Sequence, residues 1–459
     1  MSGEVLVYGL GRSGLAVVRR LRESGAPAAF FDRRGSGPDV AEALALGARS
    51  VAEVRSDRFA LAIAAPGVPI DHPDLAALRA AGTEVIGEVE WVWRTTPGTY
   101  VGISGTAGKG SVTRWTADTL AAAGMDAVAG GNIVPALAAV AKPDRVHVVE
   151  MSSFQLERCP TFAPDVAVLL NLGEDHIDRH GSVAAYHAAK RNLIANLGPD
   201  STFVVNADDP VLSRWAAESE AAGVDVKRFS LATPAAAYRT PAGMLVLEGE
   251  PLLPSSDLHV LGEHQVANAL AVALACAALG APTTAIAAGL GAFTGLPGRY
   301  SVAGHFGGVR FLEDSIATRP LSVAAALRST PRPLVWLAGG QGKGASVAEL
   351  RELVAEKVDL LVLIGASADE FRSAFGDLVP TLLIEASDGR AAMRAAVGAA
   401  HAHLQERHGG AGNVLLAPLA ASFDQFEDYA DRAAAFREAV AAVRRASGSA
   451  GAVAAGADA

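Results

Sequence analysis

The sequence is poor in cysteine and has no long hydrophobic run. Its only two cysteines, Cys159 and Cys276, lie far apart, so they predict neither a disulfide framework nor a thiolate metal site. No apolar stretch approaches the roughly 20 residues that a membrane-spanning helix needs, and the N-terminus enters an apolar strand without a basic leader. We therefore expect a cytoplasmic protein that does not bind membranes.

Positive charge is also scarce. Asp and Glu number 49 against 39 Lys and Arg, for a formal net charge of -10, and no basic cluster is visible. A nucleic-acid partner is disfavoured because binding to the phosphate backbone requires a positive face. A few placed cations and helix N-termini can still bind a small anion. We expect small-molecule partners and a monomeric protein.

Strands and helices alternate along almost the whole chain of 459 residues, which are 50% hydrophobic. This alternation predicts an α/β protein with parallel sheets. The stretch WRTTPGT near residue 95 and the stretch TGLPGR near residue 296 interrupt the rhythm. We expect three domains: a Rossmann-like domain (1–94), a central parallel-sheet domain of ATPase type (95–296) and a C-terminal Rossmann-like domain (297–459). From about residue 447 we expect a disordered tail.

A glycine-rich turn, GISGTAGKGSVT, stands between an apolar strand and a helix that begins near Ser111. Backbone N–H groups of such turns face a phosphate, and Lys109 could neutralise the outer phosphates of a nucleotide. The spacing differs from the Walker pattern, whose first glycine would fall on Ile103. Taken alone, the same residues would also suit a plain connection with a surface lysine.

Acidic, histidine and lysine residues follow the next central strands, in EMSSFQLE, NLGEDHIDRH and AYHAAKRNL. Because ligands bind at the carboxyl ends of parallel strands, Glu150 and His176 could hold a hard metal such as magnesium. Singly, His176 and Lys190 would each be better explained as structural residues. Near the N-terminus, GLGRSG and Asp32 form a dinucleotide-type fingerprint, which is a weak signal when it stands alone.

Together these motifs, in this order from about Val5 to Phe436, resemble the Mur ligase family. The turn resembles the family's GTxGK[ST][ST], and LGEHQVANALAVALA, TGLPGRY and FLEDSIAT resemble its later motifs. The segments LAGGQGKGAS and LLAPLAASFDQFEDYADRAAAF resemble the branch that adds glutamate. The resemblance implies an ATP-dependent, ADP-forming ligase of peptidoglycan precursor synthesis. Such an enzyme joins glutamate, D-glutamate by preference, to the alanine carboxylate of UDP-N-acetylmuramoyl-L-alanine through an acyl phosphate.

The resemblance also implies cofactors and roles for particular residues. ATP and two magnesium ions would be bound, and Lys190 would be carbamylated. Catalysis would depend on Lys109, His176 and Lys190. The residues implied in ATP binding are Gly105, Thr106, Ala107, Gly108, Lys109, Gly110, Ser111, Asn268, Arg299 and Asp314. The implied metal ligands are Ser111, Glu150, His176 and Lys190. The implied contacts of the UDP substrate are Arg12, Ser13, Asp32, Arg33, Arg34, Gly67, Asn132 and Ser152. The implied contacts of glutamate are Thr318, Lys343, Ser422, Phe423 and Tyr429.

The chain departs from the family pattern at several positions. Gly110 stands where a Ser or Thr usually follows the lysine, so Ser111 or a water would take that place at the metal. Gly298 replaces a histidine and Ile316 replaces a lysine, which puts a local substrate contact in doubt. Ala417 and Ala433 replace a serine and a glycine.

Alternatives to this interpretation stay open. Use of L-glutamate is one of them. A nicotinamide-dependent oxidoreductase built on GLGRSG is another, but it leaves GTAGKGS, HIDRH and SFDQF unexplained. A non-catalytic nucleotide-binding member would be consistent with Gly110, Ile316 and Ala417. Other Mur ligases and the folylpolyglutamate synthases are disfavoured, because the chain combines an N-terminal Rossmann-like unit with SFDQF.

Overall fold

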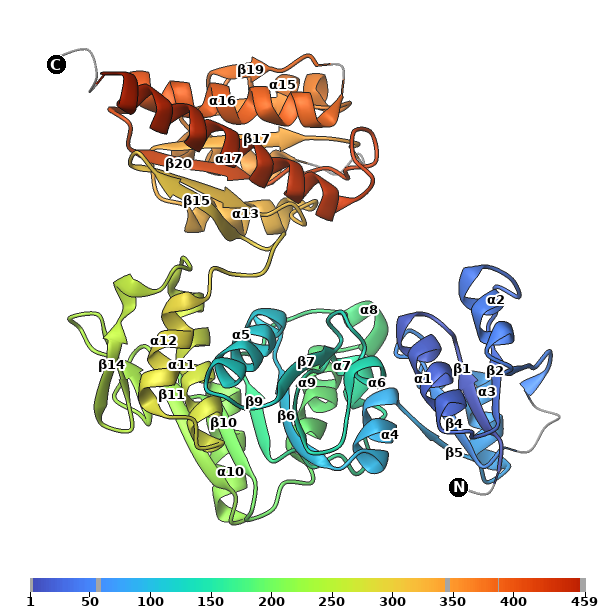
Figure 1. Cartoon of the computed structure of the whole chain (residues 1–459). Helices are drawn as coiled ribbons and strands as arrows, with labels where there is room; N and C mark the ends of the chain where they lie inside the picture. The colour runs from blue at the N-terminus through green and yellow to red at the C-terminus, as the bar shows by residue number, and fades with distance from the viewer. Residues whose placement is uncertain (1–2, 55–58, 343–346, 387, 455–459) are drawn as a thin grey trace. The chain divides into compact units, whose positions relative to one another are not determined.

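The computed structural model describes residues 3–54, 59–342, 347–386 and 388–454 (Figure 1). Contacts group the chain into two compact units. One unit comprises residues 1–258 and 263–292, and the other comprises 259–262 and 293–459. Within the described residues, no helix is both long and apolar enough to cross a membrane.

The first sheet is parallel, with strand order β3-β2-β1-β4-β5. Its strands are β1 (Val5–Tyr8), β2 (Ala28–Phe31), β3 (Arg49–Ser50), β4 (Leu61–Ala64) and β5 (Glu84–Ile86). The helices that accompany it are α1 (Arg12–Glu23), α2 (Pro38–Ala45) and α3 (Pro73–Ala80), followed by α4 (Glu88–Thr95). This order is that of a Rossmann sheet, in which ligands bind where the chain reverses direction between β1 and β4.

The second sheet has nine strands in the order β14-β13-β12-β11-β10-β9-β6-β8-β7. They are β6 (Gly98–Ser104), β7 (Ala127–Gly131), β8 (Arg145–Glu150), β9 (Val166–Leu169), β10 (Thr202–Asn206), β11 (Asp225–Ser230), β12 (Ala237–Arg239), β13 (Met244–Leu247) and β14 (Glu250–Pro254). Its helices are α5 (Lys109–Ala122), α6 (Leu137–Val140), α7 (Ser153–Leu156), α8 (Ile177–His180), α9 (Val183–Arg191), α10 (Pro210–Ala221), α11 (Glu263–Ala278) and α12 (Thr283–Ala292), with 3-10 turns at Asn192–Ile194 and Ser255–Asp257. The register pairs Ile103 with Glu150 and Ser104 with Leu169, so β6, β8 and β9 end at one edge.

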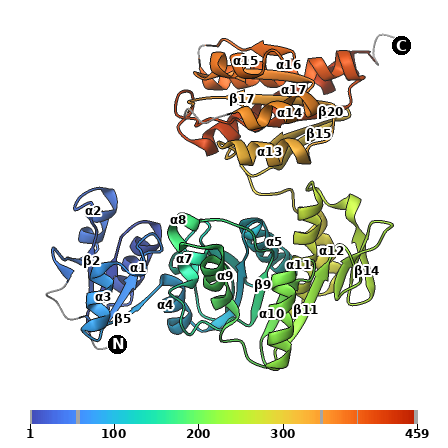
Figure 2. The same cartoon turned by 180° about the vertical axis from the view of Figure 1, so that it is seen from behind.

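The third sheet has the order β15-β16-β20-β17-β18-β19. Its strands are β15 (Ser301–Phe306), β16 (Val309–Glu313), β17 (Leu334–Gly339), β18 (Leu360–Ile364), β19 (Thr381–Leu383) and β20 (Gly412–Leu416). Its helices are α13 (Pro320–Ser329), α14 (Arg351–Lys357), α15 (Ala368–Phe375), α16 (Gly389–His408) and α17 (Tyr429–Ala454), with a 3-10 turn at Ala348–Leu350. One face packs on α13, α14 and α15 and the other on α16 and α17, as Figures 1 and 2 show. Both faces of this sheet are therefore buried.

Most strand pairs are parallel, which confirms the α/β class, but antiparallel strands occur at two edges. The pairs β12–β13, β13–β14 and β15–β16 are antiparallel. The turns of two hairpins hold residues with positive φ: Glu248 (51°) with Gly249 (89°), and Gly307 (57°) with Gly308 (77°). Two consecutive residues with positive φ form the type of turn that is common in two-residue β-hairpins. These hairpins were not predicted, because an alternation of strands and helices indicates parallel pairs only.

The C-terminal helix is longer than expected. Helix α17 extends to Ala454, past residue 447, where we expected the disordered tail to begin. The domain limits 1–94, 95–296 and 297–459 remain our proposal for dividing the chain.

Candidate active site

The glycine-rich turn of the second sheet joins β6 to α5. Gly105 (φ 154°) and Gly108 (φ 85°) adopt conformations that favour glycine. Asn171 closes the turn, because its Oδ1 accepts from the Ala107 N–H (2.9 Å) and its Nδ2 donates to the Ala107 carbonyl (3.2 Å). Thr106 Oγ1 accepts from the Gly173 N–H at 2.8 Å. The turn is thus held in shape by the segment after β9.

Two lysines converge on this turn. Lys109 Nζ donates to the carbonyls of Gly105 and Thr106, each at 3.0 Å, and Lys190 Nζ donates to the Gly105 carbonyl at 2.7 Å. Lys190 is buried, with its Nζ 4.7 Å from the centre of the Tyr186 ring. Burial, and then the charge of Lys109, lowers the pKa of Lys190 to about 7. The amine of Lys190 is therefore partly neutral near pH 7.

Glu150 lies at the end of β8, on the same edge. Its Oε1 accepts from Asn132 Nδ2 at 2.7 Å, and Asn132 directly follows β7. The strand register pairs Glu150 with Ile103, two residues before Gly105, whose carbonyl accepts from Lys190. The structure thus brings Glu150 and Asn132 to the edge that holds the glycine-rich turn.

His176 precedes α8 in a left-handed conformation (φ 53°). Its ring centre lies 4.9 Å from that of Phe154 and 6.3 Å from that of Tyr186. Tyr186 also contacts Lys190 and donates to Thr106 Oγ1 at 3.3 Å. His176 therefore belongs to the same edge as the two lysines.

The remaining predicted residues of the central domain divide into three groups. Gly110 and Ser111 lie in the first turn of α5, and Ser111 is partly buried. Asn268 of α11 lies against the turn, because a Cβ at Gly108 would come within 2.8 Å of its Oδ1. Ser152 caps α7 in a capping box with Gln155, so its hydroxyl already has a structural partner.

A hydrogen-bonded network beside this edge escaped the sequence analysis. His180 Nε2 lies 3.0 Å from Ser153 Oγ, and its Nδ1 lies 3.3 Å from Glu157 Oε1. Burial lowers the pKa of His180. The second histidine of HIDRH is the signal that could have indicated this network.

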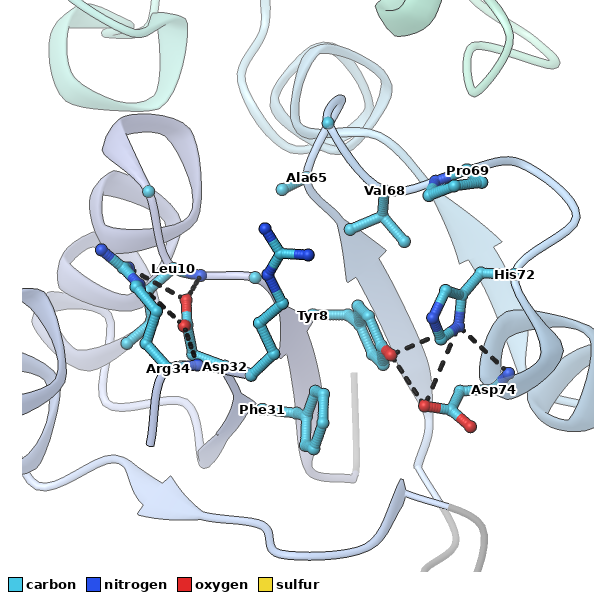
Figure 3. A pocket seen from close by; sticks show the side chains of 14 residues that line it. Tyr8, Leu10, Phe31, Asp32, Arg34, Ala65, Val68, Pro69, His72 and Asp74 are labelled. Atoms are coloured by element: carbon cyan, nitrogen blue, oxygen red, sulfur yellow. Dashed lines mark hydrogen bonds and ion pairs between the residues drawn. The ribbon is translucent and has the colours of Figure 1, made fainter. Parts of the chain in front are cut away.

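The N-terminal sheet carries a cavity of about 560 Å³ at the carboxyl ends of β1, β2 and β4 (Figure 3). The predicted residues Asp32, Arg33, Arg34 and Gly67 line it. Arg12 and Ser13, also predicted, begin α1 next to the lining residue Gly11. Gly9, Leu10 and Gly11 of GLGRSG also line it, as do Ala65 and Val68 beside Gly67. The lining residues that were not predicted are Tyr8, Phe31, Pro69, His72 and Asp74.

Asp32 faces the turn between β1 and α1. Its Oδ2 accepts from the Leu10 N–H at 2.8 Å, and its carboxylate forms hydrogen bonds of 2.9 and 3.0 Å with the Arg34 guanidinium. The hydrogen bonds from Arg34 hold the pKa of Asp32 well below its usual range. A negative group thus faces this glycine-rich turn.

The opposite end of the cavity holds three polar side chains. The Tyr8 hydroxyl donates to Asp74 Oδ2 at 2.7 Å and lies 3.4 Å from His72 Nδ1. His72 is the N-cap of α3 and accepts from the Asp74 N–H at 3.3 Å. Figure 3 shows this group on one side of the cavity and Asp32 with Arg34 on the other.

In the second unit, the predicted residues Asp314, Thr318 and Ser422 follow strands β16 and β20. Asp314 is buried, and desolvation, followed by the charge of Glu313, raises its pKa to about 7. Ser422 is also buried, while Arg299, Phe423 and Tyr429 are exposed. Lys343 lies outside the described residues.

Arg432 holds the segments around these residues together and was also missed. It is buried and donates to Ser315 Oγ (3.0 Å), to the Ser315 carbonyl (2.8 Å) and to the carbonyl of Ala420 (3.1 Å). Desolvation lowers its pKa to about 10. The arginine in YADRAAAF was visible in the sequence, but only the fold shows that it joins the segments after β16 and β20.

Comparisons with known proteins agree with this arrangement. The family models for the Mur ligase middle domain and for the MurD-like N-terminal domain of Mur ligases match residues 103–276 and 3–87. A UDP-N-acetylmuramoylalanine--D-glutamate ligase of Thermus thermophilus is 44% identical over 440 residues, covering 95% of this chain and 97% of that protein. A Deinococcus radiodurans protein of the same name is 42% identical over 450 residues, covering 96% and 93%.

Solved structures show the same fold. The UDP-N-acetylmuramate-alanine ligase MurC of Thermotoga maritima superimposes with a TM-score of 0.54 at 17% identity, covering 96% of this chain and 100% of that one. A UDP-N-acetylmuramoyl-L-alanyl-D-glutamate--2,6-diaminopimelate ligase gives a TM-score of 0.57 at 18% identity, covering 91% and 92%. The fold and the site define an α/β ligase with a glycine-rich nucleotide turn. The chain belongs to the Mur ligase family.

Proposed function

We propose that the chain is an ATP-dependent, ADP-forming ligase that joins D-glutamate to the L-alanine carboxylate of UDP-N-acetylmuramoyl-L-alanine. The observation that carries this proposal is the convergence of Lys109 and Lys190 on the Gly105 carbonyl, at the edge where Glu150 ends its strand. The names of relatives that match over nearly the full chain support the substrates.

In the proposed reaction, an oxygen of the alanine carboxylate takes the γ-phosphoryl group of ATP, and ADP leaves. The amine of glutamate then attacks the carbonyl carbon of the acyl phosphate, and the amide forms as phosphate and a proton depart. Lys109, at the start of α5, offsets charge on the transferring phosphoryl group. Asn268 and the glycine-rich turn orient the nucleotide. The cavity at Asp32 binds the UDP portion of the acceptor.

The site fits magnesium if Lys190 is modified. Among the described residues, no group of three or more His, Cys, Asp or Glu could hold a metal. Glu150 and His176 therefore need a further oxygen ligand. An amine whose pKa is lowered to about 7 is partly neutral and can add carbon dioxide, and the resulting carbamate carries two oxygens. Two magnesium ions held by Glu150, His176, carbamylated Lys190 and Ser111 would offset the charge of the phosphates.

The reaction is tested by phosphate release from the purified protein and ATP, with and without the UDP-N-acetylmuramoyl-L-alanine acceptor, combined with D-glutamate, L-glutamate or neither. We expect release only with the acceptor and D-glutamate together. Phosphate release with L-glutamate in place of D-glutamate would show that L-glutamate is the substrate. Release that ignores the acceptor, or none at all, would refute the proposal and favour a non-catalytic member.

Carbamylation has a readout that does not depend on activity. With ¹³C-labelled bicarbonate, we expect a carbamate carbon signal from the wild-type protein and from Lys142→Met, which alters an exposed lysine. The signal should vanish in Lys190→Met. A signal that survives in Lys190→Met would place the carbamate elsewhere.

We also propose that the protein acts in the cytoplasm, where ATP is available, and as a monomer. Light scattering coupled to size exclusion tests the monomer, whose mass is 46.9 kDa. A mass near twice that value would reject it.

A further inference from the structure

Glu313, the last residue of β16, places a carboxylate in the interior of the C-terminal unit. Its side chain is 0% exposed. A buried charge is costly unless it is paired and hydrogen-bonded, so its surroundings should show why it is kept there.

Three donors surround this carboxylate. Oε2 accepts from the Gly298 N–H at 2.8 Å and from Arg437 Nη1 at 2.8 Å, and Oε1 accepts from the Ser315 N–H at 3.0 Å. Gly298 belongs to the segment that enters β15, Ser315 follows β16, and Arg437 lies on α17. One carboxylate therefore joins three separate segments of the unit.

Glu313 also fixes the segment that contains Arg299. Its carboxylate accepts from the amide before Arg299, and the strand register pairs Glu313 with Ser301, two residues after Arg299. The next residue, Asp314, is anchored through its N–H, which donates to the Leu416 carbonyl at 2.8 Å. Both residues with implied nucleotide contacts in this unit, Arg299 and Asp314, are thus fixed relative to each other around Glu313.

Two departures from the family pattern meet at this point. The Ile316 N–H donates to the Gly298 carbonyl at 3.1 Å. The N–H and the carbonyl of Gly298 are therefore both hydrogen-bonded to residues of the 313–316 segment. Gly298 has φ 84°, a conformation that other residues adopt only with strain. Gly298, which stands where the family pattern has a histidine, thus adopts a positive φ and makes these two backbone hydrogen bonds.

We propose that Glu313 is a positioning residue for nucleotide binding, which sets Arg299 and Asp314 in register while Arg437 balances its charge. The inference rests on the proposed function, because the nucleotide roles of Arg299 and Asp314 belong to it. Glu313 itself does not contact the nucleotide. A purely structural role would instead stabilise the unit without affecting one ligand more than another.

Glu313→Gln is the informative variant, because it keeps the size and one acceptor oxygen but removes the charge. We expect the KM for ATP and the Kd for ADP, measured calorimetrically, to rise about tenfold, which is the effect of losing one charged hydrogen bond. The KM for the nucleotide-sugar acceptor should stay within about twofold, since the cavity at Asp32 lies in the other unit.

Two further variants bracket this result. Arg437→Met leaves both amide contacts and should weaken ADP binding about threefold. Glu438→Gln removes the neighbouring carboxylate on α17, which is 61% exposed and paired with Arg390, and should leave ADP affinity unchanged. Thermal unfolding of all three variants shows whether each remains folded at the assay temperature.

An ADP affinity of folded Glu313→Gln equal to that of the wild type would overturn the proposal. So would equal weakening of ADP and acceptor binding, because that is the signature of general destabilisation. ADP affinity is measured without turnover. If wild-type protein binds ADP but releases no phosphate with acceptor and glutamate, the proposed function fails while the role of Glu313 is still decided.

Discussion

Two glycine-rich turns in this chain stand at matching places in their sheets and have opposite chemical surroundings. Each follows a strand that has parallel neighbours on both sides and leads into a helix, α1 in one case and α5 in the other. At the first turn, the carboxylate of Asp32 accepts from the Leu10 N–H. At the second, the Gly105 carbonyl accepts from Lys109 and Lys190. The first turn therefore faces a negative group and the second faces cations.

The difference teaches that a glycine pattern predicts a turn between a strand and a helix and not a ligand. At the first turn, a Cβ on Gly14 would lie 2.0 Å from the Gly9 carbonyl, so glycine lets α1 approach the turn closely. The ligand is selected by residues from elsewhere in the chain. Asp32 follows β2 and suits hydroxyl groups, whereas Lys190 comes from α9, where the carbamylation that we propose would make it a metal ligand.

The largest effect on activity is expected from a substitution in the second turn. Lys109→Met should lower acceptor-dependent phosphate release about a thousandfold, or about 4 kcal/mol in transition-state stabilisation, because the turn loses its charge toward the phosphates. Steady-state phosphate release measures this. Lys142→Met, at an exposed position, is the matched control. A loss below tenfold would mean that the two turns do not differ as we describe.

A smaller effect is expected at the first turn. Asp32→Asn should raise the KM for the nucleotide-sugar acceptor about tenfold and leave the KM for ATP unchanged, because one charged hydrogen-bonding group is lost there. Glu42→Gln, which breaks the exposed pair with Arg19, serves as the control. Equal changes in both KM values would show that the turns do not divide the ligands between them.

The two turns should also differ in their response to acid. Because the pKa of Asp32 is lowered by folding, its stabilising contribution is present above the unfolded value of 3.8 and is lost as pH falls through the folded value. We expect roughly 1 kcal/mol, since Arg34 is half exposed and its charge is screened. Hydrogen exchange of the Leu10 amide, compared between pH 6 and pH 3, measures this. Protection that falls equally in Asp32→Asn would contradict it.

The smallest effect is expected from a substitution at the Tyr8 end of the cavity beside the first turn. Tyr8→Phe removes the hydroxyl that donates to Asp74 but keeps the ring against Phe31, 4.9 Å away between centres. We expect at most a threefold rise in the KM for the acceptor, because the lost hydrogen bond joins two protein side chains and does not contact the substrate. It only orders the wall of the cavity. A tenfold rise would make the Tyr8 end as important as the Asp32 end.

The sequence was sufficient for the α/β class and for the meeting of Lys109 and Glu150 at one edge. Alternating strands and helices imply parallel sheets, and parallel strands align their carboxyl ends, so residues after those strands meet. The family resemblance supplied the roles of Lys190 and Asn268, which no strand end indicates.

Other features depend on contacts that no local pattern announces. The group of Tyr8, His72 and Asp74 joins the end of β1 to the start of α3, and each residue taken alone looks like an ordinary strand or helix-start residue. In FLEDSIAT, only Asp314 was predicted as a site residue, and nothing in the local pattern set Glu313 apart. Its importance became visible only when the fold brought Gly298 and Arg437 to it.

The closeness of Gly108 and Asn268 has a consequence for how this protein can vary. A methyl group at position 108 would come within 2.8 Å of the Asn268 side-chain oxygen, so that side chain would have to move. The φ of 85° would strain any larger residue even after this movement. Shortening the residue on α11 would therefore not be enough to admit a side chain at position 108.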